Sequence, residues 1–253
     1  LTGTATDCNS VLTGGFSGIS NPAVTLTDTN VAASDLNTLN GNTSGTINAS
    51  NVTVITGTAA QCNTLYGAAG FSNLGDEAVT ISDTELAASV LNTLNGNTQG
   101  VVNAASVTTL TGTAADCNTA YAANGATPAT ISGLGNENVT ISGSATKAVY
   151  DTLNTYTEGT INMASATVQD TLANVNTLRG TASGFSNFGS ITVTLTDTEL
   201  AASALNTLNG NTTGVVNAAS VTTLTGTAAD CNTAYAANGA TPATISGLGN
   251  ENV

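Results

Sequence analysis

Polar and apolar residues alternate over short stretches that recur along this chain. In residues 79–82 (Val-Thr-Ile-Ser) and 193–196 (Val-Thr-Leu-Thr), the apolar side chains fall at every second position. A period of two places them on one face of an extended backbone. Each stretch is therefore predicted to be a half-buried β-strand.

A pattern typical of a helix follows the first of these strands, over residues 84–94. Its apolar side chains are spaced to lie on one helix face: Leu86, Val90, Leu91 and Leu94. Ser82 stands three residues before Glu85, which predicts a capping box at the helix start. Gly96 predicts the helix end, because glycine readily adopts the conformation that closes a helix.

A second strand and helix come next in the same order. Residues 101–110 are predicted to be extended, and residues 113–121 to be helical. A variable glycine-rich stretch then closes the pattern. It has a short form at residues 70–75 and a longer form at residues 126–135.

These elements belong to a tandem array. Residues 79–138 and 193–252 differ only at Ile81/Leu195, Ser82/Thr196, Val90/Ala204 and Gln99/Thr213. Shorter units divide the whole chain. We expect a partial repeat at 1–23, followed by repeat units at 24–78, 79–138, 139–192 and 193–253.

The array predicts an α/β solenoid, in which short parallel strands stack into a sheet and short helices lie on the opposite side. A mainly β-solenoid is the alternative. A string of independent domains of about 55 residues is less favoured, because such domains bury little surface. Because the chain begins and ends inside a repeat, we expect it to be one continuous slice of a longer array.

Composition excludes several classes of function. The net charge is −14, Lys147 and Arg179 are the only basic side chains, and there is no histidine. A protein that binds nucleic acid or an acidic membrane needs a cationic surface. Zinc sites and serine-type catalytic triads normally need histidine. A β-helix lyase is disfavoured as well, since it would need basic residues beside clustered acids. We expect no enzyme, no cofactor, no nucleic-acid partner and no membrane insertion.

Four cysteines recur at one position of the repeat: Cys8, Cys62, Cys117 and Cys231. Matching positions hold Val175, Leu91 and Leu205. A position that also accepts aliphatic residues is typical of an apolar core. Successive thiols would lie on the order of 14 Å apart in stacked coils, beyond disulfide reach. We expect buried structural thiols. Cross-links between chains and metal binding remain alternatives.

Four asparagines also recur at one position: Asn48, Asn103, Asn162 and Asn217. Stacked amides at a solenoid turn would explain them as structural residues.

The acidic residues are dispersed. Asp28, Asp83 and Asp197 precede predicted helices, where carboxylates stabilise free N–H groups. Asp76 and Glu77 form an adjacent acidic pair and are weak candidates for calcium.

Two surface features suggest binding. Threonine pairs such as Thr25/Thr27 would form ladders, which could order ice, although threonine also simply suits strands. Loops carrying Phe16, Phe71, Phe185 and Phe188 could contact glycans.

The stretch 205–230 (Leu-Asn-Thr-Leu-Asn-Gly-Asn-Thr-Thr-Gly-Val-Val-Asn-Ala-Ala-Ser-Val-Thr-Thr-Leu-Thr-Gly-Thr-Ala-Ala-Asp) resembles strand-repeat regions of giant cell-surface proteins of marine cyanobacteria and related bacteria. This resemblance implies an extended, secreted protein without catalytic residues.

The sequence thus predicts a structural protein that forms an extracellular fibre, sheath or surface layer by repeat stacking and self-association. Its partners would be copies of itself or adjacent repeats of the same chain. The alternative is the stalk of a giant adhesin with calcium-, glycan- or ice-binding loops.

Overall fold

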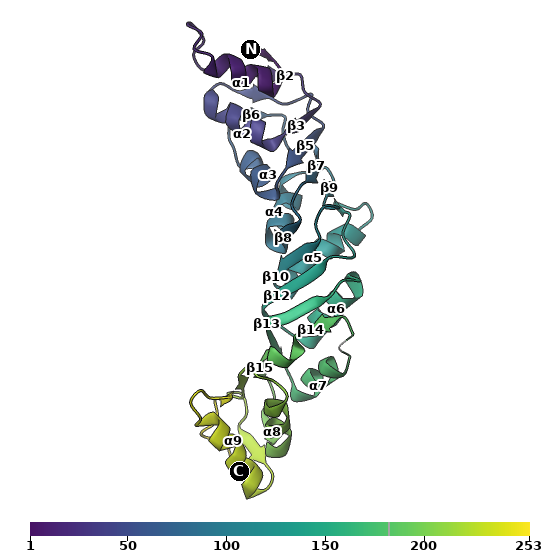
Figure 1. Cartoon of the computed structure of the whole chain (residues 1–253), viewed down its shortest axis with the longest axis vertical. Coiled ribbons are helices and arrows are strands. Elements are labelled where there is room, and N and C mark those ends of the chain that lie inside the picture. The colour runs from purple at the N-terminus through teal and green to yellow at the C-terminus, as the bar shows by residue number, and fades with distance from the viewer. Residues whose placement is uncertain (182) are drawn as a thin grey trace. The chain divides into compact units, whose positions relative to one another are not determined.

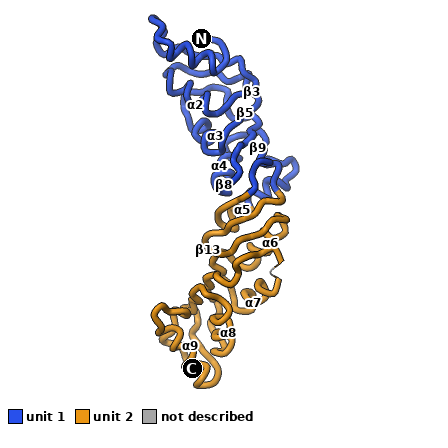
Figure 2. The backbone as a smooth tube through the Cα atoms, viewed as in Figure 1, with its two compact units in different colours: residues 1–108, 119–134 blue, residues 109–118, 135–253 orange. Residues whose placement is uncertain are grey.

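The computed structural model describes residues 1–181 and 183–253 and forms two compact units (Figures 1 and 2). Unit 1 comprises residues 1–108 and 119–134, and unit 2 comprises residues 109–118 and 135–253. Every strand pair named below is parallel. The α/β class with parallel sheets is therefore confirmed.

The helices are short, between eight and twelve residues each. They are α1 (Ala5–Thr13), α2 (Ala33–Asn42), α3 (Ala59–Tyr66), α4 (Ala88–Asn97), α5 (Ala114–Gly125), α6 (Lys147–Tyr156), α7 (Leu172–Gly180), α8 (Ala202–Gly210) and α9 (Ala228–Asn238). A 3-10 helix, η1, covers Phe188–Ser190.

Unit 1 contains two parallel sheets. One has the order β1 (Thr2–Gly3), β2 (Val24–Leu26), β4 (Ile47–Asn48) and β6 (Phe71–Ser72). The other has the order β11 (Ile131–Ser132), β9 (Val102–Asn103), β7 (Ala78–Ile81), β5 (Val54–Gly57) and β3 (Asn30–Ala32). Strand β8 (Glu85–Ala87) leads into α4. Figure 1 shows α1 to α4 on the left of this unit and β3, β5, β7 and β9 on its right.

Unit 2 contains a longer parallel run and a separate strand pair. The run has the order β10 (Thr109–Gly112), β12 (Asn138–Ala145), β13 (Ile161–Asp170), β15 (Thr192–Leu195), β17 (Val216–Asn217) and β19 (Ile245–Ser246). Strand β14 (Phe185–Ser186) also pairs with β13. The separate pair is β16 (Glu199–Ala201) with β18 (Thr223–Thr225).

The strand at the start of a predicted repeat is bonded on both sides. Val79 pairs with Ile55 before it and with Val102 after it. In the same way Val139 pairs with Leu110 and Ile161, and Val193 pairs with Val168 and Val216. Paired residues lie 22 to 29 positions apart in the chain, so each step passes through about one strand–helix segment.

Small and medium apolar side chains fill the core. Leu36, Ile55, Leu91 and Val193 are fully buried, and the largest fully buried side chain is Tyr150. Because most core residues are small or medium-sized, a segment of 22 to 29 residues can close around them.

The helix after the 79–82 strand begins later than predicted. Residues Glu85–Ala87 are extended, and α4 begins at Ala88 with no side-chain cap. The carbonyl of Thr84 accepts a hydrogen bond from the Thr108 N–H (2.8 Å) and is therefore not available to start a helix. The predicted capping box at Ser82 and Glu85 is wrong, and Gly96 lies inside the helix rather than at its end.

Candidate functional site

All four cysteines are buried and free of disulfide bonds: Cys8, Cys62, Cys117 and Cys231. Burial raises the pKa of the Cys62 thiol to about 11 and that of Cys117 to about 12. A thiol with so high a pKa is a poor nucleophile at neutral pH. This arrangement suits packing rather than chemistry.

The four recurring asparagines each close their own turn. The side-chain carbonyl of Asn48 accepts from the Ser50 N–H (3.1 Å), and Asn103, Asn162 and Asn217 accept in the same way from Ala105, Ala164 and Ala219. They do not stack on one another. Strand register instead places Asn48 between Thr25 and Ser72, and Asn217 between Thr194 and Ser246.

The acidic pair at residues 76–77 is split by the fold. Asp76 is exposed, whereas Glu77 is 1% exposed. One oxygen of Glu77 accepts from the Gly75 N–H (2.8 Å) and from the Tyr66 hydroxyl (3.3 Å), and its other oxygen has no partner. The described residues contain no group of three or more Cys, Asp or Glu side chains suited to a metal ion.

The Tyr66–Glu77 pair recurs near the C-terminus. The Tyr235 hydroxyl donates to Glu251 (2.8 Å), and this hydrogen bond, together with burial, raises the pKa of Tyr235. In the 139–192 repeat both partners change together, to Arg179 and Ile191. The tyrosine and the glutamate therefore behave as one feature of a repeat.

Aspartates cap helices, but not the helices that follow them. The side chains of Asp28, Asp83 and Asp197 accept from the first N–H of α1, α3 and α7, at 2.7 to 2.8 Å. Those helices lie 23 to 25 residues earlier in the chain. Asp170 does the same for α6 through the Lys147 N–H (2.9 Å). These carboxylates therefore hold one segment against the next.

Asparagines on the helices form a second set of contacts that the sequence analysis missed. The Asn63 side-chain amide of α3 donates to the Val90 carbonyl of α4 (3.1 Å). Equivalent bonds begin at Asn9, Asn37, Asn118 and Asn206. Each of these asparagines directly follows the buried Cys or Leu position of its helix. This recurrence in the sequence could have identified them.

A third set of contacts recurs once in each repeat and is called here the Thr-x-Gly clasp. Thr98 is 7% exposed; its hydroxyl donates to the Glu77 carbonyl (2.7 Å) and accepts from the Gly100 N–H (3.0 Å). The other clasps begin at Thr43, Thr157 and Thr212. A Cβ on Gly100 would lie 2.2 Å from the Glu77 carbonyl oxygen, so only glycine fits.

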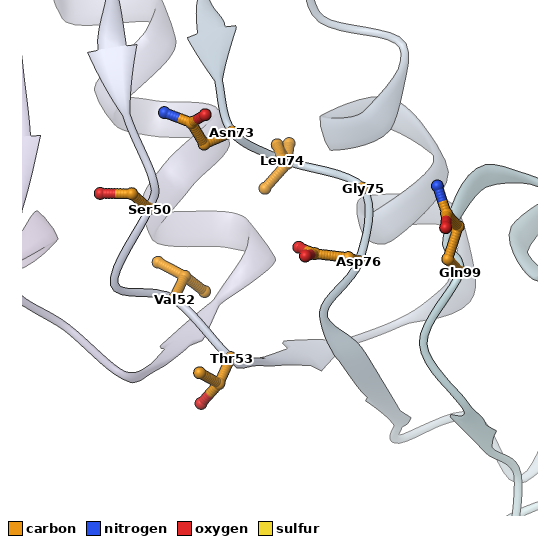
Figure 3. Close-up of a pocket in the computed structure, with 8 residues that line it drawn as sticks. All are labelled: Ser50, Val52, Thr53, Asn73, Leu74, Gly75, Asp76 and Gln99. Carbon is orange, nitrogen blue, oxygen red and sulfur yellow. The ribbon is translucent and has the colours of Figure 1, made fainter.

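A polar groove opens in unit 1 between the 50–53 turn and the 73–76 loop, with a volume of ≈ 610 Å³. Its lining comprises Ser50, Val52, Thr53, Asn73, Leu74, Gly75, Asp76 and Gln99. Figure 3 shows the Asp76 carboxylate and the Leu74 side chain directed into the space between the two segments. This is the unit 1 groove.

A smaller groove of ≈ 320 Å³ occupies the same repeat position in unit 2. It is lined by Ala219, Val221, Thr222, Gly247, Leu248, Gly249, Asn250 and Glu251. This is the unit 2 groove.

The phenylalanines differ in exposure. Phe16 is 63% exposed, whereas Phe188 is 8% exposed and packs edge-to-face on Phe185 at 6.5 Å between ring centroids. Phe71 is half-buried in β6. Of the four predicted aromatic contacts, Phe16 is thus the one that presents most of its ring.

No protein-family model, curated protein or solved structure matches this chain. Among the helices of the described residues, none combines the length and the apolar character needed to span a bilayer. The function is therefore inferred from the chain's own residues.

Proposed function

We propose that this chain is an α/β solenoid with a non-catalytic, structural function in an extracellular fibre, sheath or surface layer. The observation that carries the proposal is the double bonding of Val79, Val139 and Val193. A strand that completes one repeat and starts the next leaves no independent domain boundary there. Such an arrangement is typical of arrays in which each repeat is stabilised by its neighbours.

The use of polar side chains supports the same proposal. Asp83 caps the helix of the preceding segment, Asn63 bonds the next helix, and Thr98 clasps the preceding segment. Each contact joins residues 21 to 27 positions apart. Side chains that would otherwise serve binding or catalysis are thus engaged in joining successive segments.

Surface charge supports a role outside the cell in salt water. A net charge of −14 keeps single chains soluble, and salt screens the repulsion between them. Nearly identical repeats also favour self-association, because a contact that does not close on itself builds filaments or sheets. The partners would be copies of this chain or neighbouring repeats.

The test is the assembly state of the purified chain at low salt and at seawater ionic strength. We expect filaments or sheets by negative-stain electron microscopy at high salt, with matching fast-sedimenting species in the ultracentrifuge. A monodisperse monomer at every salt and protein concentration would contradict the self-association.

An adhesin stalk with ligand-binding loops is the second candidate. The unit 1 groove favours it, because polar side chains line a concave surface there.

A further inference from the structure

The two grooves offer an internal comparison, because they occupy matching positions of the repeat. Val52 and Thr53 of unit 1 correspond to Val221 and Thr222 of unit 2, and Leu74 corresponds to Leu248. Differences in their hydrogen bonding therefore show which groove has polar groups to offer a ligand.

In the unit 2 groove, the backbone N–H and carbonyl of Leu248 are both hydrogen-bonded to a side chain of the protein. The Asn238 side chain accepts from the Leu248 N–H (3.1 Å) and donates to its carbonyl (3.1 Å). The connection from Tyr235 to Ser246 is longer than the one from Tyr66 to Ser72, and the extra residues include Asn238. In unit 1 the Leu74 N–H and carbonyl make no hydrogen bond within the described residues.

The side chains of the unit 1 groove are also less engaged. The Asp76 carboxylate and the Gln99 side-chain amide make no hydrogen bond to another described residue, and Asp76 is replaced by Asn250 in unit 2. Val52 is only 5% exposed, so the half-buried Leu74 side chain supplies the apolar surface beside them. The unit 1 groove thus combines hydrogen-bond donors and acceptors around a small apolar patch.

The chemistry of this lining excludes several ligands. None of the lining residues is cationic, so an anion would meet Asp76 without a counter-charge. A cation would rely on one exposed carboxylate, which contributes little in water. An added peptide strand finds no free edge at the turn, because the Thr53 N–H bonds Thr29 and the Thr53 carbonyl bonds Ala78.

We infer that the unit 1 groove binds a neutral, hydroxyl-rich saccharide. Sugar hydroxyls donate and accept, which matches the Asp76 carboxylate, the Gln99 side-chain amide and the Leu74 backbone. The C–H face of a sugar ring suits the half-buried Leu74 side chain. A volume of ≈ 610 Å³ lies within the range of small-molecule sites. The inference does not depend on the proposed structural function.

The test is a titration of the isotope-labelled full chain with cellobiose, maltose and chitobiose, followed by amide NMR shifts. We expect saturable shifts at Leu74, Gly75 and Gln99 with at least one disaccharide, with a Kd of about 1 mM. Asp76→Ala is expected to weaken binding at least about tenfold, because a charged hydrogen-bond partner is lost. Asn250→Ala, the matched change in unit 2, is expected to leave it unchanged.

Three results would overturn the inference. One is the absence of saturable shifts with all three sugars. Another is equal response of Leu248 and Leu74, since the unit 2 groove is internally satisfied. The third is a response of the groove to calcium chloride in place of the sugars. Asp76 is exposed, so its variant is expected to remain folded, and unchanged amide shifts in the unit 1 strands β5 and β7 would verify that.

Discussion

The most restrictive positions in this protein are single residues at which two backbones meet. At Gly100 the neighbouring backbone lies so close that a Cβ would overlap it, and Gly45, Gly159 and Gly214 are placed alike. The adjacent threonine hydroxyl then uses both its donor and its acceptor, so the clasp is fully satisfied. Buried hydroxyl groups are tolerated under that condition.

Gly100→Ala is expected to destabilise the protein by about 2 kcal/mol, because the overlap is with backbone that must shift. Chemical denaturation measures the loss. The control is Gly96→Ala in α4, where a Cβ meets nothing within 4 Å. That change is expected to be neutral or to stabilise by about 0.5 kcal/mol, as alanine favours helix. Equal effects of the two changes would contradict the clasp.

At the scale of elements, neighbouring helices are joined by amide side chains as well as by apolar packing. The Asn63→Ala change removes two bonds between α3 and α4: the one donated to the Val90 carbonyl and the one accepted from the Asn97 side chain. We expect a loss of about 1 kcal/mol, together with faster hydrogen exchange in both helices. Thr93→Ala removes only a bond within α4 and serves as the control. Faster exchange confined to α3 would show that the amide does not couple the helices.

Because aspartate carboxylates cap helices of the preceding segment, the free energy of unfolding is expected to depend on pH. Burial alone would raise the pKa of Asp170, but hydrogen bonds from Asn174 and from the Lys147 and Thr171 N–H groups outweigh it and lower the pKa. A lowered folded-state pKa means that this stabilisation is present above the ordinary value of 3.8 and is lost as pH falls further.

Asp170→Ala is expected to cost about 1 kcal/mol at neutral pH, as for other helix caps. The loss should shrink below pH 3.8, where the native carboxylate also becomes protonated. Denaturation curves of both proteins across this range test the point. A difference that stays constant down to the lowest pH would refute a role for the carboxylate charge.

At the scale of the whole chain, the central question is whether repeats are separate or continuous. Val139 is fully buried and bonded to β10 and to β13. Val139→Ala is expected to cost about 2 kcal/mol and to speed hydrogen exchange in both strands. The exposed neighbour Thr140→Ala is the control. Faster exchange in only one of the two strands would favour independent domains.

Sequence periodicity predicted the α/β class and the strands at 79–82 and 193–196 within one residue, since those strands alternate cleanly. It misplaced the start of α4, because the bond between Thr84 and Thr108 is non-local. The helix asparagines and the Thr-x-Gly clasps were visible as repeats, but their partners lie a full segment away. The unit 1 groove could not be predicted, because it depends on the 73–76 loop having, among the described residues, no side chain that bonds the Leu74 backbone, as Asn238 bonds Leu248 in unit 2.

Tyr66 and Glu77 are both replaced in the 139–192 repeat, by Arg179 and Ile191, and the burial of Glu77 favours one order of mutation over the other. Losing the glutamate first leaves an unpaired tyrosine hydroxyl, which is a neutral group and therefore costs less to leave without a partner than a charged one. Losing the tyrosine first removes a hydrogen-bond donor from the Glu77 carboxylate, which is 1% exposed and already has one oxygen without a partner. Leaving a buried charged group without a partner is costly. The two positions are thus epistatic. Intermediate repeats with tyrosine alone should survive selection, whereas repeats with glutamate alone should be rare.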